Sequence, residues 1–123
     1  YNVSCASSIS QMAAIAALTT GIDDALAMRE EYKRRRDYVY GRLQEMNLEV
    51  VKPDGAFYFF VKLPKGYDSS FDFALKLAKE GKVAVVPGSA FTVYGEGYFR
   101  ISYACSMKTL EQALNRMQSF LQA

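Results

Sequence analysis

Residues 98–104 have the sequence YFRISYA, in which an arginine and a serine alternate with aromatic and aliphatic side chains. This alternation predicts a strand from Phe99 to Tyr103, because successive side chains of a strand point to opposite faces. Arg100 and Ser102 then share one face. The planar guanidinium of Arg100 can donate two parallel hydrogen bonds to both oxygens of a carboxylate. The pattern alone leaves open that Arg100 points into water, as most arginines do.

Three earlier segments also have strand-like composition. They are Leu48–Val51, Ala56–Leu63 and Val83–Val86. The first two are separated by Lys52-Pro53-Asp54-Gly55, whose Pro-Asp-Gly order favours a tight turn and therefore a hairpin. Residues 56–61 are apolar on both faces, so one face is expected to lie on the core and the other against something outside it.

Two helices are predicted in the first third of the chain. Ser8 and Gln11 fit a capping box that opens a short helix ending near Thr20, and Gly21 is placed to end it with a positive φ. The acidic pair Asp23-Asp24 then suits the first turn of a longer helix, which an apolar stripe continues to about residue 46.

Two more helices are predicted in the rest of the chain. Ser69 or Ser70 can cap a helix that runs to about Glu80, with Gly81 as its end. Ser106 can cap a final helix with a regular apolar stripe. Together with the strands, these helices predict an α+β fold, a small mixed or antiparallel sheet of about four strands covered by helices.

The pair Pro87-Gly88 follows the third strand-like segment, and three interpretations of it stay open. The pair could form an ordinary turn, or Gly88 could adopt a positive φ or allow a close approach of another backbone segment. The neighbouring Ser89, like Ser102, has no histidine and no glycine-framed elbow to activate it, so we interpret both serines as hydrogen-bonding residues.

Composition limits the number of domains and the kind of partner. A chain of 123 residues, half of them hydrophobic, can bury one core, so we expect a single domain over residues 1–123. Its formal net charge of +2 is too small to indicate nucleic-acid binding. The basic block at residues 33–36 lies on a predicted helix that also carries acidic residues, which favours a solvated helix face.

The sequence contains no histidine and two widely separated cysteines, Cys5 and Cys105. Neither a zinc site nor a histidine-based catalytic triad is therefore expected in this chain. Tyr1 is not an initiator methionine, and we interpret the chain as a fragment of a longer one. The sequence shows no signal peptide and no apolar run of membrane-spanning length, so we expect a cytoplasmic protein with no membrane partner.

Three motifs resemble one known family. They are Ser8–Gln11 before an Ala-rich helix, Lys52–Tyr58, and Val85–Phe91 followed by Phe99–Ala104. In order and separation these motifs are similar to the C-terminal part of the fold-type I pyridoxal-phosphate-dependent aminotransferases, class I/II, from about residue 1 to residue 121. Within that family the chain most resembles the bacterial aromatic and N-acetyl-diaminopimelate aminotransferases.

The resemblance implies roles for two residues. The arginine aligned with Arg100 grips the α-carboxylate of the substrate, and the aromatic residue aligned with Phe57 lies beside the substrate. The resemblance also implies that pyridoxal 5'-phosphate and the lysine that forms a Schiff base with it belong to a larger domain upstream. We therefore expect no catalytic, cofactor-binding or metal-binding residue in this chain, and no activity from this chain alone.

The expected function of the full-length protein is the transfer of an amino group between an amino acid and a 2-oxo acid. Its expected partners are those two substrates, the absent large domain and a second copy in a homodimer, without nucleic acid. Two alternatives stay open: an aminotransferase-like domain that senses a ligand in a transcription regulator, and a stand-alone protein-interaction module.

Overall fold

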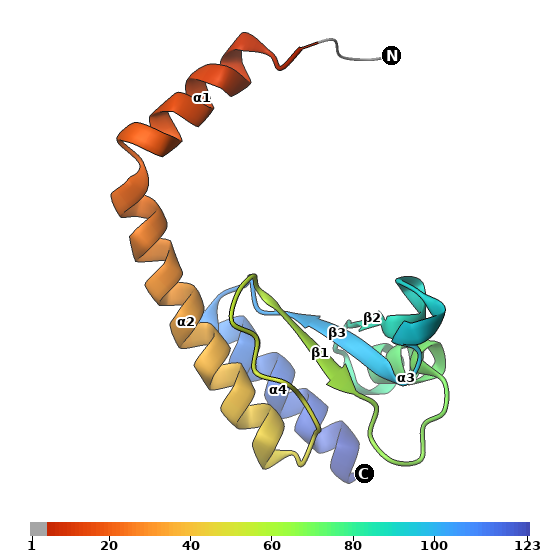
Figure 1. Ribbon diagram of the computed structural model, residues 1–123. Coiled ribbons are helices and arrows are strands. Elements are labelled where there is room, and N and C mark those ends of the chain that lie inside the picture. The colour runs from red at the N-terminus through yellow and green to blue at the C-terminus, as the bar shows by residue number, and fades with distance from the viewer. Residues whose placement is uncertain (1–4) are drawn as a thin grey trace. The chain divides into compact units, whose positions relative to one another are not determined.

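A computed structural model describes residues 5–123; the first four residues of the predicted domain, Tyr1–Ser4, lie outside the described residues (Figure 1). Contacts divide the chain into two compact units, Tyr1–Lys33 and Arg34–Ala123, which are described separately below. The elements of the chain are α1 (Ser8–Thr19), α2 (Ile22–Glu45), β1 (Tyr58–Lys62), α3 (Ser70–Lys76), a π-helical turn (Leu77–Gly81), β2 (Val86–Pro87), two 3-10 turns (Gly88–Ala90 and Val93–Gly95), β3 (Tyr98–Ser102) and α4 (Met107–Gln122).

The N-cap of helix α1 lies one residue earlier than predicted. Ser7, rather than Ser8, is the N-cap, and its hydroxyl accepts the backbone N–H of Ser10 at 3.2 Å. The predicted capping box is wrong in its second half too, because the amide of Gln11 donates to the carbonyl of Ala6 at 2.9 Å. Adjacent serines offer equivalent hydroxyls, so the pattern identified the kind of cap but not its position.

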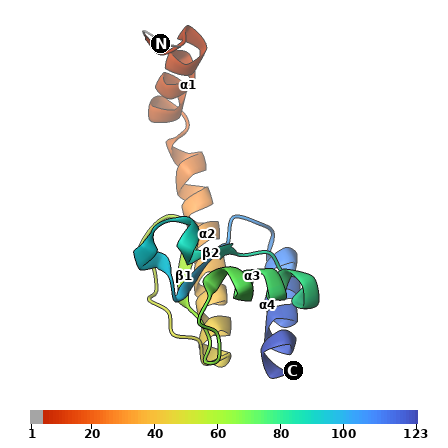
Figure 2. The same cartoon turned by 90° about the vertical axis from the view of Figure 1, so that its right-hand side faces the viewer.

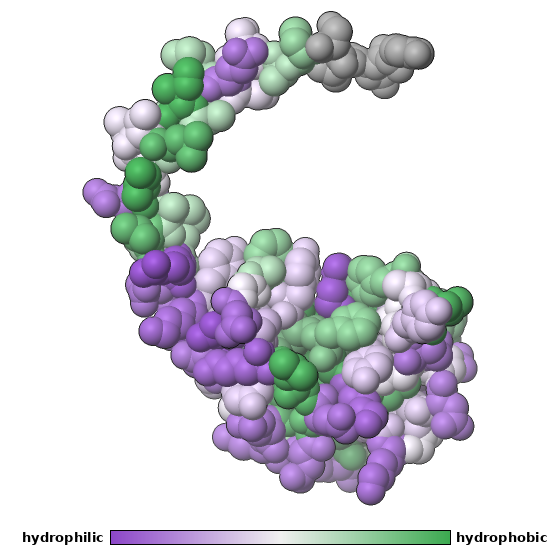
Figure 3. Space-filling view, in the orientation of Figure 1, coloured by the Kyte–Doolittle hydropathy of each residue, from purple (hydrophilic) through white to green (hydrophobic). Residues whose placement is uncertain are grey.

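The end of α1 also differs from the prediction. Thr20 ends the helix in a right-handed conformation, and Gly21 is not among the positive-φ glycines of the described residues, which are Gly66 and Gly97. No side chain of α1 is buried, and Figure 3 shows apolar side chains along this helix. The large exposed ones on α1 are Ile9, Met12, Ile15 and Leu18.

The second unit is built on a three-stranded antiparallel sheet of order β1-β3-β2. The α+β prediction is confirmed, but the predicted first strand, Leu48–Val51, contributes only the single bridge between Val50 and Val61. Pro53 has no N–H to donate, and Ala56 adopts a φ of 58°, so the chain turns away before a ladder can extend.

Strand β2 is shorter than the predicted Val83–Val86. The N–H of Val83 donates to the carbonyl of Leu77 at 3.4 Å instead of to a neighbouring strand, and Pro87 has no N–H. Only Val86 and Pro87 pair with β3, opposite Arg100 and Phe99 respectively.

The later helices start where the sequence predicts. Ser69 caps α3, and Ser106 caps α4; each hydroxyl accepts the backbone N–H three residues ahead. The predicted single helix to Glu80 is instead α3 followed by the π-helical turn, and the left-handed residue after it is Lys82, with a φ of 56°. No helix within residues 5–123 is both long and apolar enough to cross a membrane.

The core of the second unit lies against one face of the sheet. Helix α4 lies beside the last turns of α2, where Arg42 donates to Asn115 and Gln118 at 2.9 Å each (Figures 1 and 2). The buried side chains include Val39, Leu43, Phe59, Val61, Phe73, Phe99, Ile101, Leu110, Leu114 and Met117. The strand residues between them, at even positions of β1 and β3, therefore form the opposite face of the sheet.

Candidate functional site

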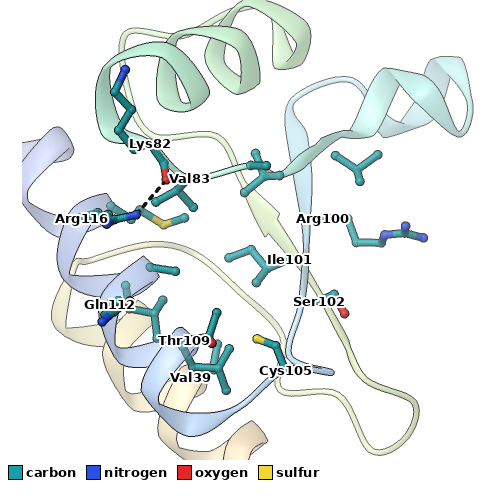
Figure 4. A pocket seen from close by; sticks show the side chains of 17 residues that line it. Val39, Lys82, Val83, Arg100, Ile101, Ser102, Cys105, Thr109, Gln112 and Arg116 are labelled. Atoms are coloured by element: carbon teal, nitrogen blue, oxygen red, sulfur yellow. Dashed lines mark hydrogen bonds between the residues drawn. The ribbon is translucent and has the colours of Figure 1, made fainter.

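Arg100 lies on the face of the sheet that the core leaves free. It is half-buried on β3, flanked in register by Phe60 of β1 and Val86 of β2. Its neighbours along the strand, Phe99 and Ile101, are buried in the core. The predicted alternation is therefore confirmed, and the side chain points away from the core, as Figure 4 also shows.

The guanidinium of Arg100 contacts two aromatic rings. Its Cζ atom lies 4.2 Å from the ring centroid of Tyr58 and 4.5 Å from that of Phe91. Within residues 5–123 it has no hydrogen-bond or ion-pair partner, whereas Arg36 pairs with Asp37 at 3.1 Å. The N–H groups of Arg100 are thus available to an external acceptor.

An aromatic face, which we define as Tyr58, Phe60, Phe91 and Tyr98, surrounds this guanidinium. The ring of Phe60 stacks on Tyr98 with 5.3 Å between centroids and meets Phe91 edge-on at 6.1 Å. The sequence motifs did not assign these residues to the site. Alternation along β3 could have grouped Tyr98 with Arg100, whereas Tyr58 and Phe60 also require the register between β1 and β3, and Phe91 follows a 3-10 turn.

Phe57 is brought close to this site through Tyr58. Their ring centroids lie 4.5 Å apart, and the Phe57 side chain is 37% exposed. Tyr103 fixes this segment twice: its N–H donates to the carbonyl of Phe57, and its hydroxyl donates to that of Ala56, both at 2.9 Å. The two residues predicted for substrate binding, Arg100 and Phe57, therefore border the same ring.

A close backbone approach places Phe91. A Cβ atom added to Gly88 would lie 1.9 Å from the carbonyl oxygen of Gly95 and 2.7 Å from that of Tyr98. Among the interpretations left open for Gly88, the close approach is thus the one that the structure shows. The carbonyl of Gly88 accepts the N–H of Phe91 at 3.0 Å, so this contact positions the ring on Arg100.

The turn behind Phe91 is held by polar contacts. The carboxylate of Glu96 accepts the N–H of Ser70 at 2.6 Å and that of Gly97 at 3.1 Å. These two hydrogen bonds hold the pKa of Glu96 below its usual range, and the bond from Ser70 contributes the most. The hydroxyl of Ser70 bonds that of Ser89 at 3.0 Å, consistent with our interpretation of Ser89 as a hydrogen-bonding residue.

The lysines do not provide a cofactor-binding amine at this face. Lys62 lies on the same face of β1, but its Nζ atom pairs with Glu49 at 2.8 Å. That hydrogen bond raises the pKa of Lys62, whereas a nucleophilic amine needs a lowered pKa. Lys62 is therefore not suited to bind pyridoxal phosphate covalently, and no group of acidic, cysteine or histidine residues within residues 5–123 could hold a metal.

A cavity of about 360 Å³ lies on the other face, between the β2–β3 edge and α4 (Figure 4). Val83, Ile101, Cys105 and Thr109 line it, and Arg100 also lines it but turns its guanidinium away from these side chains. The cavity wall is mainly apolar, although Lys82, Ser102, Gln112 and Arg116 also line it. The candidate site is therefore the guanidinium of Arg100 with its aromatic face.

Comparisons with known proteins agree with this architecture. The family model for aminotransferase class I and II matches residues 1–117. The chain is 59% identical over 121 residues to a probable N-acetyl-LL-diaminopimelate aminotransferase of Bacillus subtilis, covering 98% of this chain and 31% of that protein. It is 47% identical over 123 residues to aromatic-amino-acid aminotransferase 2 of Thermococcus litoralis, covering 98% and 32% respectively.

Solved structures match as well. The aspartate aminotransferase of Thermotoga maritima superimposes with a TM-score of 0.87 at 38% identity, over 99% of this chain and 30% of that one. The crystal structure of Pyrococcus protein-A1 gives 0.92 at 46% identity, over 99% and 32%. The chain thus spans about a third of the length of these relatives. It belongs to the class I and II aminotransferase family.

Proposed function

We propose that this chain is the small C-terminal domain of a pyridoxal-phosphate-dependent aminotransferase and that Arg100 binds the α-carboxylate of its substrates. One observation carries the proposal: the guanidinium of Arg100 contacts two rings, at 4.2 and 4.5 Å, yet has no polar partner within the described residues. A guanidinium placed in this way offers a planar pair of donors to a carboxylate.

A carboxylate is the group that both substrates of a transamination share. The amino donor and the 2-oxo acid that accepts the amino group differ in their side chains but not in the α-carboxylate. One arginine can therefore orient both substrates for their half-reactions. Phe57, whose ring is 37% exposed, would lie beside the part of the substrate that differs.

The names of the relatives support a shared grip. They are named for N-acetyl-LL-diaminopimelate, aromatic amino acids and aspartate, which have different side chains and a common α-carboxylate. These names also favour an enzyme over the alternatives of a ligand sensor in a transcription regulator and a protein-interaction module.

The cofactor would be bound mainly outside this chain. Pyridoxal phosphate, when bound, supplies the electron sink for amino transfer. Lys62, on the same face of the sheet as Arg100, is not suited to bind it covalently, because its Nζ atom pairs with Glu49 at 2.8 Å. We propose that an absent large domain holds it, in a cytoplasmic homodimer, while this chain binds and orients the carboxylate.

The test is the replacement Arg100→Lys in the complete protein, with 2-oxoglutarate as the acceptor. Lysine keeps the charge and loses the two-pronged geometry, so kcat/KM should fall about 30- to 1000-fold for donor and acceptor alike. Arg116→Lys is the matched control, because within residues 5–123 its guanidinium donates only to the carbonyl of Lys82, at 3.4 Å. If Arg100→Lys leaves both constants within about twofold while the fold is intact, Arg100 does not bind the carboxylate.

A further inference from the structure

The orientation of the Arg100 guanidinium has an unusual source. An arginine that must bind a carboxylate in one geometry is commonly fixed by a protein acceptor, but the described residues give Arg100 none. What contacts it instead are the rings of Tyr58, on β1, and Phe91, at the end of the first 3-10 turn. Two separate elements of the fold thus converge on one guanidinium.

We propose that Tyr58 and Phe91 are positioning residues that hold the guanidinium of Arg100 ready for the carboxylate. This proposal rests on the proposed function of Arg100. It adds that two neighbouring side chains hold the guanidinium in the orientation that carboxylate binding requires. A cation is attracted to the face of an aromatic ring without consuming any N–H donor. Ring contacts can therefore fix the side chain and leave its hydrogen-bonding edge to the ligand.

The two rings are themselves held in place. Phe91 meets Phe60 edge-on at 6.1 Å, and Phe60 stacks on Tyr98 at 5.3 Å. Tyr58 lies in the ladder between β1 and β3, opposite Ser102. A support that is rigid before the ligand arrives reduces the ordering that binding requires, because a free arginine side chain has many rotamers to lose.

Substitutions at Tyr58 and Phe91 can separate the effect of the aromatic ring from the effects of side-chain size and polarity. Tyr58→Phe keeps the ring and removes only the hydroxyl, whereas Tyr58→Leu removes the ring and keeps an apolar side chain. Phe91→Leu does the same on the second element, in a residue that is 45% exposed and therefore tolerant of replacement. Phe71→Leu, at a ring on α3 that is 60% exposed, is the matched control.

The experiment measures kcat/KM for the amino donor and for 2-oxoglutarate with the complete protein. Tyr58→Leu and Phe91→Leu should each lower both constants about 3- to 30-fold. Tyr58→Phe should recover most of what Tyr58→Leu loses, and Phe71→Leu should stay within about twofold of the wild type. In an Arg100→Lys background the leucine variants should add little, because residues that act through one group are not additive. Melting temperatures of all variants identify any that fail to fold.

A second readout does not depend on turnover. Relaxation of the Arg100 Nε–H group, measured by NMR, should show an ordered side chain in the wild type and a more mobile one in both leucine variants. The inference is overturned if the leucine variants behave like Phe71→Leu in both assays while Arg100→Lys still lowers the constants. If Arg100→Lys itself has no effect, it is the proposed function that fails.

Discussion

The close approach of Gly88 and Gly95 provides a sharp test of how the site is built. Gly88→Ala would place a Cβ atom 1.9 Å from the carbonyl oxygen of Gly95, whereas real Cβ atoms essentially never come within 3.0 Å of a heavy atom from a non-adjacent residue. The two backbone segments would therefore have to separate by at least about 1.1 Å. The obstacle is backbone, so no flexible side chain can move aside.

We expect this substitution to lower the free energy of unfolding by about 3 kcal/mol, the upper part of the range for overpacking. For a chain of this size that corresponds to a fall in melting temperature of about 12 °C. Gly95→Ala should behave similarly, because its Cβ atom would lie 2.2 Å from the carbonyl oxygen of Gly88. Urea unfolding followed by circular dichroism measures both variants.

The matched control is Gly41→Ala in α2, where an added Cβ atom meets nothing within 4 Å. Alanine in a helix interior is favoured over glycine by about 1 kcal/mol, so this variant should be as stable as the wild type or more stable. If Gly88→Ala unfolds within about 0.5 kcal/mol of the wild type, the two glycines do not meet as described. The close approach of Gly88 and Gly95 could then no longer explain why the ring of Phe91 lies on the guanidinium of Arg100.

Three further predictions concern the chain as a whole and two of its hydrogen bonds. The 123-residue chain, mixed with pyridoxal phosphate and reduced with borohydride, should show only scattered, slow lysine labelling and no transaminase turnover; stoichiometric labelling of one lysine with turnover would contradict this. Tyr103→Phe should lower the free energy of unfolding by about 1 kcal/mol, because the hydroxyl bond to Ala56 is lost; an unchanged urea midpoint would contradict it. Glu96→Gln should lower the melting temperature at neutral pH, and the difference from wild type should shrink as the pH falls through the lowered pKa of Glu96. The reason is that a carboxyl group with a depressed pKa stabilises the fold only while it is ionised. A difference in melting temperature that is independent of pH would contradict the role of the hydrogen bond from Ser70 to Glu96.

The helices and the alternation around Arg100 could be predicted because they depend on local patterns. Ser69 and Ser106 cap helices as their sequences indicate, and β3 buries every second residue. The predicted strand at Leu48–Val51 did not form, for a reason outside its own composition. Its residues have strand propensity, but Ala56 takes a positive φ and the chain leaves the sheet after one bridge.

The aromatic face could be predicted only in part. Alternation places Tyr58 and Phe60 on one face of β1, yet their position beside Arg100 depends on the register between β1 and β3. Phe91 reaches Arg100 through the approach of two glycines seven residues apart, which a local pattern does not encode. The sequence pattern pointed to Arg100, and the family resemblance implied its role. The aromatic rings that support its guanidinium could be identified only from the folded structure.

The central claim is that Arg100 and the substrate carboxylate bind each other. It is tested most directly by the dissociation constants of the amino donor and of its neutral amide for the complete wild-type protein and the Arg100→Lys variant. These four values give the coupling between the arginine and the carboxylate. A coupling of about 2–4 kcal/mol is expected for a charged pair of this kind. A coupling below about 0.5 kcal/mol in a correctly folded variant would contradict the claim.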